Sequence, residues 1–330
     1  MTALAGTQTG EETIEDMKKI EAVPALFSAG APTGYTRDIL ECNLPPEVLA
    51  ALLKDRATGK NIFWATDDYT ARGPGFSRHD EITLEAVLNR ADPVIRPRVD
   101  KPKDVQKSRA SGRAEVFTPS WVCNIQNNCV DAAWFGWKKP NSSPFNNETR
   151  TAPPGKRASC AFESASRENW KVSLRPIRFP KGKSWRDYVK APRLEISCGE
   201  APYLASRYDA VSGAMIHVPD RIGLLDRKLR VVSENAEDRQ DWLHYAKRAV
   251  QSCYGFEWQG DNVLLARENL LATVAEHYNW IACGEASTSL AHLDFSFLLE
   301  IAEIKSKIDE FANAKRPTPS VYNLAITSEF

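Results

Sequence analysis

Three short segments of this sequence carry residues that could together hold a small, nucleotide-like ligand. The last of them is a predicted strand that ends at Glu257 and Trp258 and is followed by a helical pattern. An acid at the tip of such a strand can accept hydrogen bonds from two ribose hydroxyls, and an aromatic ring beside it can cover an adenine. The alternative is an exposed strand-end glutamate beside a packed tryptophan.

The second segment is a turn centred on Gly199. A short predicted strand precedes it, and the turn itself contains Cys198, Gly199 and Glu200. A glycine at the carboxyl end of a strand lets a ligand approach the backbone, and ligands of open α/β sheets bind at these strand ends. We predict a ligand-binding turn leading into a helix, with an ordinary strand-to-helix turn as the alternative. Ala201 and Pro202 stand where a glycine-rich loop would have more glycine.

The first segment is Phe117-Thr118-Pro119, which precedes a helix-like run through Asn128. Proline after threonine favours a corner between extended chain and helix, where a backbone amide and a hydroxyl could meet a charged group. Many helices begin with Thr-Pro, so this segment alone is a weak signal. The seven cysteines form no C-x-x-C pair, and the five histidines form no metal-binding motif. We expect neither a disulfide framework nor a metal site.

In their order and content these segments resemble the gamma class of adenine-N6 DNA methyltransferases, the modification subunits of restriction–modification systems. The matching residues are Phe117-Thr118-Pro119, Cys198-Gly199-Glu200-Ala201 and Tyr254-Gly255-Phe256-Glu257. Residues 116–124 and 222–230 are also similar to chains of this family, and the resemblance covers residues 50–300 approximately.

The resemblance implies S-adenosylmethionine (S-adenosyl-L-methionine) as cofactor, double-stranded DNA as partner, and methyl transfer to N6 of adenine without a protein nucleophile or metal. In the family, the glycine turn binds the methionine end of the cofactor and the strand-end acid binds its ribose. The cofactor-binding residues that it implies are Phe117, Thr118, Pro119, Cys198, Gly199, Glu200, Glu257 and Trp258.

The family's catalytic loop, Asn-Pro-Pro-Tyr or Asn-Pro-Pro-Phe, does not occur in this sequence. In that loop the asparagine binds the amino group of a flipped adenine. Asn43-Leu44-Pro45-Pro46 has an intervening leucine and precedes the cofactor segments. We therefore assign no catalytic residue. We expect a truncated or split enzyme, whose second subunit or C-terminal half supplies the loop and target recognition, in preference to a shortened paralogue retained for binding.

Two locally basic regions support an alternative function, a non-catalytic DNA-binding or scaffolding subunit of a restriction system. Residues 95–113 contain seven Lys and Arg against two Asp, which fits a solvated linker or a phosphate-contacting arm. Residues 171–193 interleave basic and aromatic side chains, which fits nucleic-acid stacking or simply core aromatics. An unrelated nucleotide-binding oxidoreductase is disfavoured because no G-x-G-x-x-G follows a strand.

Positioning the three segments requires parallel strands whose carboxyl ends meet. We predict an α/β fold in which an α-rich N-terminal region precedes the first part of a Rossmann-like S-adenosylmethionine-dependent methyltransferase sheet. The predicted elements are helices at 44–53, 237–252, 263–278 and 293–312 and a strand at 61–66. The predicted parts are a flexible leader (1–22), an N-terminal region (23–137), a surface loop or insertion (138–160), a partial cofactor-binding core (161–300), and a helix with a polar tail (301–330).

The composition is that of an ordinary globular protein. The 330 residues carry 43 Lys+Arg and 43 Asp+Glu, and 42% are hydrophobic, which argues against a disordered chain and against one that coats nucleic acid through bulk positive charge. No apolar run reaches the roughly 20 residues of a membrane helix, and no signal-peptide layout is present. We expect a cytoplasmic protein with no membrane partner.

Overall fold

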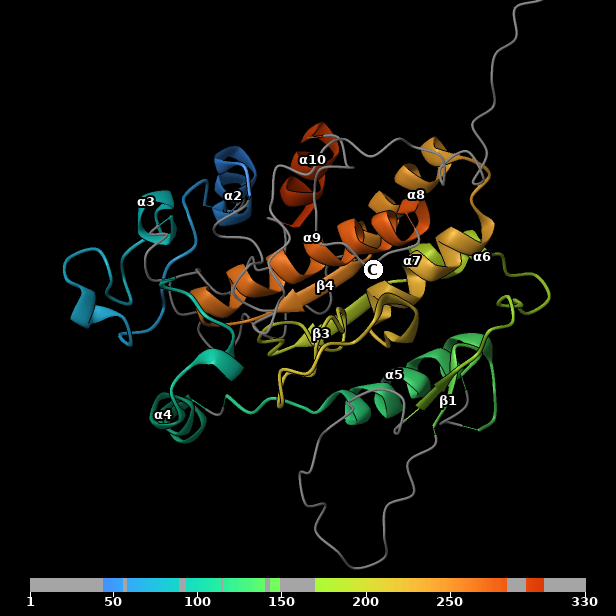
Figure 1. Cartoon of the computed structure of the whole chain (residues 1–330), viewed down its shortest axis with the longest axis horizontal. Coiled ribbons are helices and arrows are strands. Elements are labelled where there is room, and N and C mark those ends of the chain that lie inside the picture. The colour runs from blue at the N-terminus through green and yellow to red at the C-terminus, as the bar shows by residue number, and fades with distance from the viewer. Residues whose placement is uncertain are drawn as a thin grey trace, which may run out of the picture.

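The computed structural model describes residues 44–55, 58–88, 93–113, 115–139, 143–148, 170–283 and 295–305 (Figure 1). The predicted leader, most of the predicted surface loop and the polar tail lie outside these ranges. The elements are α2 (Pro46–Leu53), η1 (Thr70–Arg72), α3 (Leu84–Val87), η2 (Arg98–Asp100), α4 (Lys103–Arg113), α5 (Ser120–Phe135), β1 (Asn146–Glu148), β2 (Trp170–Val172), α6 (Trp185–Lys190), β3 (Arg193–Ile196), η3 (Val218–Asp220), α7 (Leu224–Asn235), α8 (Arg239–Gln251), β4 (Cys253–Phe256), α9 (Gly260–Cys283) and α10 (Phe295–Lys305).

Two parallel strands, β3 and β4, lie at the centre of the fold (Figure 1). Arg193 pairs with Cys253 and Ile196 with Phe256, so both strands end at the same level. Parallel neighbours need a crossover connection, and here the chain passes through α7 and α8 between them. The predicted strands on either side of this crossover are confirmed. The helix predicted directly after Gly199 is wrong, because residues 202–217 run through turns and α7 begins only at Leu224.

Helices cover one side of the strand pair. The 24-residue helix α9 follows β4 and packs against α2, α7 and α10, while α8 packs against β4, α7 and α10. Figure 1 shows α8, α9 and α10 on one side of the strands and α4 and α5 on the other. The helices predicted at 44–53, 237–252 and 263–278 are confirmed, and the one at 293–312 is confirmed over the described residues 295–305.

Along β3 and β4, buried and exposed residues alternate in an unusual way, because apolar side chains stand on the exposed face. On β3, Arg193 and Glu195 are buried, whereas Leu194 and Ile196 are 51% and 68% exposed; on β4, Tyr254 is 47% exposed. A half-buried strand normally turns its apolar residues inward. Within the described ranges the sheet contains only these two strands, so an apolar face and two strand edges are left open.

The strand predicted at 61–66 is wrong. This segment forms only isolated antiparallel bridges, Asn61 to Lys54 and Phe63 to Glu81. It crosses the beginning of α9, where the Gly260 N–H donates to the Trp64 carbonyl over 3.1 Å. A Cβ atom at Gly260 would stand 1.8 Å from the Phe63 carbonyl oxygen, so only glycine permits this crossing.

The described residues therefore form a mixed helix-and-strand fold with a parallel strand pair and a separate antiparallel pair, β1 with β2. No helix among them is both long and apolar enough to cross a membrane. The predicted part boundaries stay predictions.

Candidate functional site

A pocket of about 520 Å³ lies at the carboxyl ends of β3 and β4. Its walls come from five separated stretches of the chain, and it contains six of the eight residues that the sequence singled out: Phe117, Thr118, Cys198, Gly199, Glu257 and Trp258. The structure does not place Pro119 or Glu200 among its lining residues. A pocket of this volume is in the range that accommodates a small molecule or cofactor.

The two strand ends are joined directly at the pocket. The Gly199 N–H donates to Glu257 Oε2 over 2.8 Å, and the N–H groups of Trp258 and Gln259 donate to Glu257 Oε1 over 2.9 and 3.1 Å. Burial raises the pKa of the Glu257 carboxyl, and the three backbone N–H donors oppose that rise. A carboxylate can accept about four hydrogen bonds, so Glu257 retains capacity for a ligand hydroxyl.

Backbone strain is concentrated in the turn after β3. Ser197, Gly199 and Ala201 all have positive φ, at 53°, 54° and 62°, a region that non-glycine residues rarely occupy. A Cβ atom on Gly199 would lie 3.2 Å from the ring of Phe117. The positive φ and the close approach of backbone and ring favour glycine here, and the contact brings the first and second segments together. Strained backbone of this kind clusters at ligand sites.

The first segment forms the predicted corner. Pro119 is extended, with φ −61° and ψ 145°, and stands just before the helix α5. The Ser120 N–H at the start of that helix donates to Asp209 Oδ2 over 2.7 Å. The sequence suggested that a backbone amide at this corner could bind a charged ligand, but the carboxylate of Asp209 already accepts that hydrogen bond. Only Phe117 and Thr118 of the segment therefore face the pocket.

Glu200, which the resemblance implies as a cofactor-binding residue, is buried and does not line this pocket. Its carboxylate is buried and accepts hydrogen bonds from the Arg98 N–H and the Tyr208 hydroxyl over 2.5 and 2.6 Å. It fixes the segment around η2 to the turn after β3. Burial raises the pKa of this carboxyl, and the Tyr208 hydroxyl opposes the rise.

Sequence reasoning missed Glu195, which lines the pocket from β3. It is 8% exposed and accepts hydrogen bonds from the N–H groups of Tyr203 and Leu204 over 3.3 and 3.2 Å. Burial raises its pKa to about 8, against the two backbone donors. The available signal was an acid between Leu194 and Ile196 in a predicted strand, where burial of a carboxyl is costly without a specific reason.

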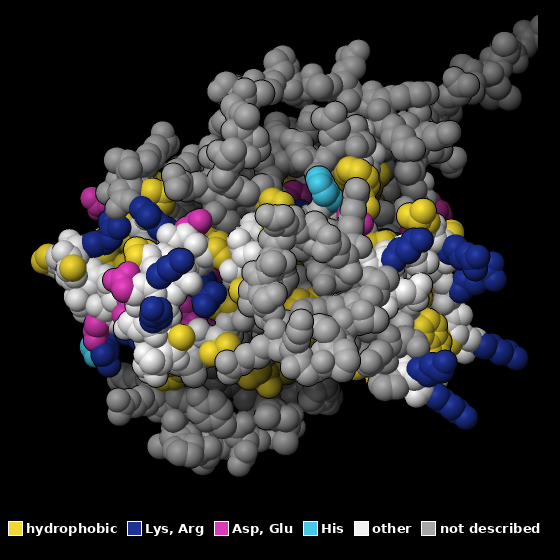
Figure 2. Space-filling model, turned by 60° about the horizontal axis from the view of Figure 1, so that its bottom comes forward, with side chains coloured by type: hydrophobic (Ala, Val, Ile, Leu, Met, Phe, Trp, Pro, Cys, Tyr) yellow, Lys and Arg dark blue, Asp and Glu magenta, His cyan; other side chains and the backbone are white. Residues whose placement is uncertain are grey.

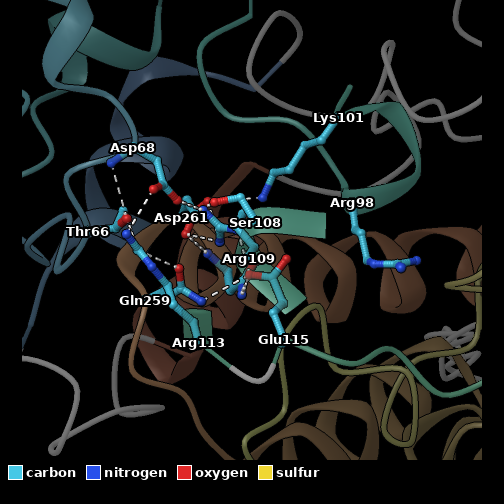
Figure 3. A network of polar contacts seen from close by, with 12 residues as sticks. Thr66, Asp68, Arg98, Lys101, Ser108, Arg109, Arg113, Glu115, Gln259 and Asp261 are labelled. Carbon is cyan, nitrogen blue, oxygen red and sulfur yellow. Dashed lines mark hydrogen bonds and ion pairs between the residues drawn. The ribbon is translucent and has the colours of Figure 1, made fainter. Parts of the chain in front are cut away.

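A buried charge network closes one side of the pocket (Figure 3). Arg109, 2% exposed, contacts Asp261, Glu115 and Asp68 at 3.0, 2.6 and 2.7 Å. Lys101 also contacts Asp261 at 3.1 Å. Burial alone would raise the pKa of Asp261, but Lys101 and Arg109 hold it well below its usual range. Neither a solvated linker nor a phosphate-contacting arm describes Lys101 and Arg109, because both are internal ion-pair partners.

Arg113 continues the network to the pocket wall. It donates to Asp68 Oδ1 over 2.8 Å, to Gln259 Oε1 over 3.2 Å and to the Thr66 hydroxyl. Figure 3 shows this arm of contacts beside the Arg109 cluster. Arg113, Thr66 and Gln259 all line the pocket, so the charged network and the ligand site share a wall.

The second basic region divides between core and surface. Trp170 and Tyr188 are 2% and 0% exposed, as the core interpretation of the aromatics predicts. The cations of this region lie at the surface, with the exception of the buried Arg193. Lys and Arg side chains project together from the right-hand end of the molecule in Figure 2, the end at which α6 and β1 lie in Figure 1. We define the cationic surface as the exposed residues Lys138, Lys139, Lys171, Arg175, Arg178, Lys181, Lys183, Arg186 and Lys190.

Asp187 is the one exposed acid between residues 170 and 190, so this surface is strongly positive although the whole chain is neutral. In the part of the chain that the structure describes, no three His, Cys, Asp or Glu side chains are grouped to hold a metal ion. Comparison with protein-family models, with curated proteins and with solved structures found no match to this chain.

Proposed function

We propose that this chain binds S-adenosylmethionine and serves as the cofactor-binding part of a DNA adenine-N6 methyltransferase, the modification subunit of a restriction–modification system. The observation that carries the proposal is the convergence of three separated segments on one pocket. Phe117 and Thr118, the Gly199 turn and Glu257 all line it, and a Gly199–Glu257 hydrogen bond joins two of the segments.

The arrangement suits a ligand that carries a nucleoside. In open α/β sheets such ligands bind beyond the carboxyl ends of the strands, which is where the pocket lies. Glu257 stands at the tip of β4, where it can accept a hydrogen bond from a ribose hydroxyl. The half-exposed ring of Trp258 lines the same pocket, so that it can cover an adenine. Glu195 and Glu257 line the same pocket with carboxyl groups that can form hydrogen bonds to a ligand. These features support a Rossmann-like origin for the strand pair.

Methyl transfer requires more than cofactor binding. S-adenosylmethionine supplies an activated methyl group, and the chain's task would be to bind and orient it. The sequence has no Asn-Pro-Pro-Tyr or Asn-Pro-Pro-Phe loop to hold adenine. We therefore propose that another polypeptide segment supplies adenine and target recognition, and that the cationic surface contacts the phosphates of double-stranded DNA.

Calorimetric titration with S-adenosylmethionine tests the proposal. Wild type should release or absorb heat with a single site, and Glu257→Ala should weaken binding by about 1.5–3 kcal/mol, because a charge-assisted hydrogen bond to the ribose is lost. The matched control is Glu300→Ala, since Glu300 pairs with Lys247 on α8 and does not line the pocket. Thermal melts of both variants separate lost binding from lost folding. Absence of any binding by folded wild type rejects the proposal.

The second candidate function is a non-catalytic DNA-binding or scaffolding subunit, which the cationic surface favours. Electrophoretic mobility shifts across a salt series discriminate between the two. Each phosphate contact contributes about 0.9 to the slope of log affinity against log salt, so the triple change Arg175→Ala, Arg178→Ala and Lys181→Ala should lower the slope by up to about 2.7. A steep slope that S-adenosylmethionine does not alter favours the scaffold.

A further inference from the structure

The two carboxylate oxygens of Glu115, a residue that lines the pocket, have different surroundings. Its Oε2 accepts from Arg109 Nε, Gln259 Nε2 and Asn262 Nδ2 over 2.6, 3.0 and 3.3 Å. Its Oε1 is buried and has no hydrogen-bond partner among the described residues. Figure 3 shows one carboxylate oxygen of Glu115 turned away from the dashed contacts. The three donors on Oε2 hold the side chain in this orientation.

Asn262 repeats the pattern in the first turn of α9. Its amide nitrogen donates to Glu115, whereas its Oδ1 is buried without a partner in the described part of the chain. The contact through Glu115 also fixes which end of the amide is free, because a flipped amide would place Oδ1 against the Glu115 carboxylate. Glu115 and Asn262 are 8% and 1% exposed and both line the pocket.

Two neighbouring side chains that line the pocket and are joined by a 3.3 Å hydrogen bond therefore each carry a buried acceptor with a fixed orientation and no partner among the described residues. Buried polar groups in folded proteins are nearly always hydrogen-bonded, and an acceptor left unmatched costs free energy. A ligand group that supplies two N–H bonds would satisfy both oxygens at once. A hydroxyl supplies one donor only. A magnesium or calcium ion needs six or more oxygen ligands.

We propose that Glu115 Oε1 and Asn262 Oδ1 form the subsite that binds an amino group of the ligand, either a primary ammonium or an aromatic amine. The assignment rests on the proposed function, and it names two positioning residues for which the three sequence segments gave no signal. S-adenosylmethionine carries both kinds of amino group, the α-ammonium of its methionine part and the 6-amino group of its adenine. Both amino groups can donate two N–H hydrogen bonds, one to the carboxylate oxygen of Glu115 and one to the amide oxygen of Asn262.

The test is a calorimetric comparison of three ligands on wild type, Glu115→Gln and Asn262→Ala. S-adenosylhomocysteine carries both amino groups, 5′-methylthioadenosine lacks the α-ammonium, and S-inosylhomocysteine lacks the 6-amino group. Glutamine at 115 should keep its carbonyl oxygen toward the three donors and turn its NH₂ into the pocket, which replaces an acceptor by a donor without changing size. Glu300→Gln is the control, because Glu300 is an exposed acid that pairs with Lys247 and does not line the pocket, and its replacement changes the net charge by the same amount.

We expect Glu115→Gln and Asn262→Ala to weaken S-adenosylhomocysteine binding about tenfold or more, and Glu300→Gln to leave it unchanged. The analogue that lacks the amino group held in this subsite should bind wild type weakly. Its affinity should be no lower for the two variants than for wild type. The identity of that analogue tells which amino group occupies the subsite.

Equal losses for all three ligands, or no loss for any, with wild type binding S-adenosylhomocysteine normally, would overturn the subsite and leave the proposed function standing. Failure of folded wild type to bind S-adenosylhomocysteine and S-adenosylmethionine would reject the proposed function, and with it this assignment. Asn262→Ala leaves the Arg109–Glu115 ion pair in place, so it keeps the test open if Glu115→Gln does not fold.

Discussion

The contact between Gly199 and Phe117 makes a quantitative prediction about the turn after β3. An added methyl group at Gly199 would meet two ring carbons of Phe117 at 3.2 and 3.3 Å, on a backbone whose φ is 54°. We expect Gly199→Ala to destabilise the protein and to weaken ligand binding, because both the backbone and the ring must move.

The structure also supplies the control. Gly136 ends α5 with a φ of 73°, but a methyl group there would have no atom within 4 Å. Gly136→Ala should therefore lower the free energy of unfolding only by the cost of placing alanine in a left-handed conformation, about 1–2 kcal/mol. Gly199→Ala should lower the free energy of unfolding by this amount and by about 1–3 kcal/mol more for the crowded contact with Phe117, which gives a total of about 2–5 kcal/mol.

Urea denaturation of the two variants measures the difference. Phe117→Leu in the Gly199→Ala background should restore part of the stability, since it removes the ring that the methyl group meets. If Gly199→Ala loses no more stability than Gly136→Ala, or if Phe117→Leu restores nothing, the packing of the first segment on the turn is not what constrains residue 199.

Two further predictions concern the buried acids. Asp261→Asn should cost about 3–5 kcal/mol of unfolding free energy in urea, since it leaves Arg109 and Lys101 short of a buried carboxylate; a loss no larger than that of the exposed Asp67→Asn would contradict the role of the network. Glu195 has a pKa of about 8 in the folded chain, above its ordinary value of 4.5, so between these pH values the folded chain holds a proton that the unfolded chain has released. Stability should therefore fall as pH rises through this window, and Glu195→Gln should remove that fall; a Glu195→Gln effect that is constant from pH 5 to 8 would show that burial does not hold the proton.

The sequence predicted the central geometry because that geometry depends on local patterns and one general rule. Short apolar strands ending at Gly199 and Glu257 are visible in the sequence, and parallel strands bring their carboxyl ends together. These facts predict that the two turns lie close together, whereas the hydrogen bond between Gly199 and Glu257 is visible only in the structure. The helices were equally accessible, since Leu49 and Trp242 each begin a helical spacing of apolar residues that the structure buries.

The remaining features depend on partners that are distant in the sequence. In the sequence, Arg109 resembles a surface cation, because its partners Asp68 and Asp261 are 41 and 152 residues away. Residues 61–66 have a strand-like composition, but a strand also needs a neighbour with which to pair, and composition does not show whether one exists. Glu200 matched a family position, yet its carboxylate is used by Arg98 and Tyr208.

The inverted alternation of β3 bears on how the isolated protein would behave in solution. Leu194, Ile196 and Tyr254 form an outward apolar patch beside strands whose outer edges are unpaired in the described part of the chain. Such a surface is a template for pairing between molecules. Concentrated samples should therefore self-associate through this patch on heating, and a polar residue at position 196 should raise the temperature at which light scattering begins, without touching the pocket.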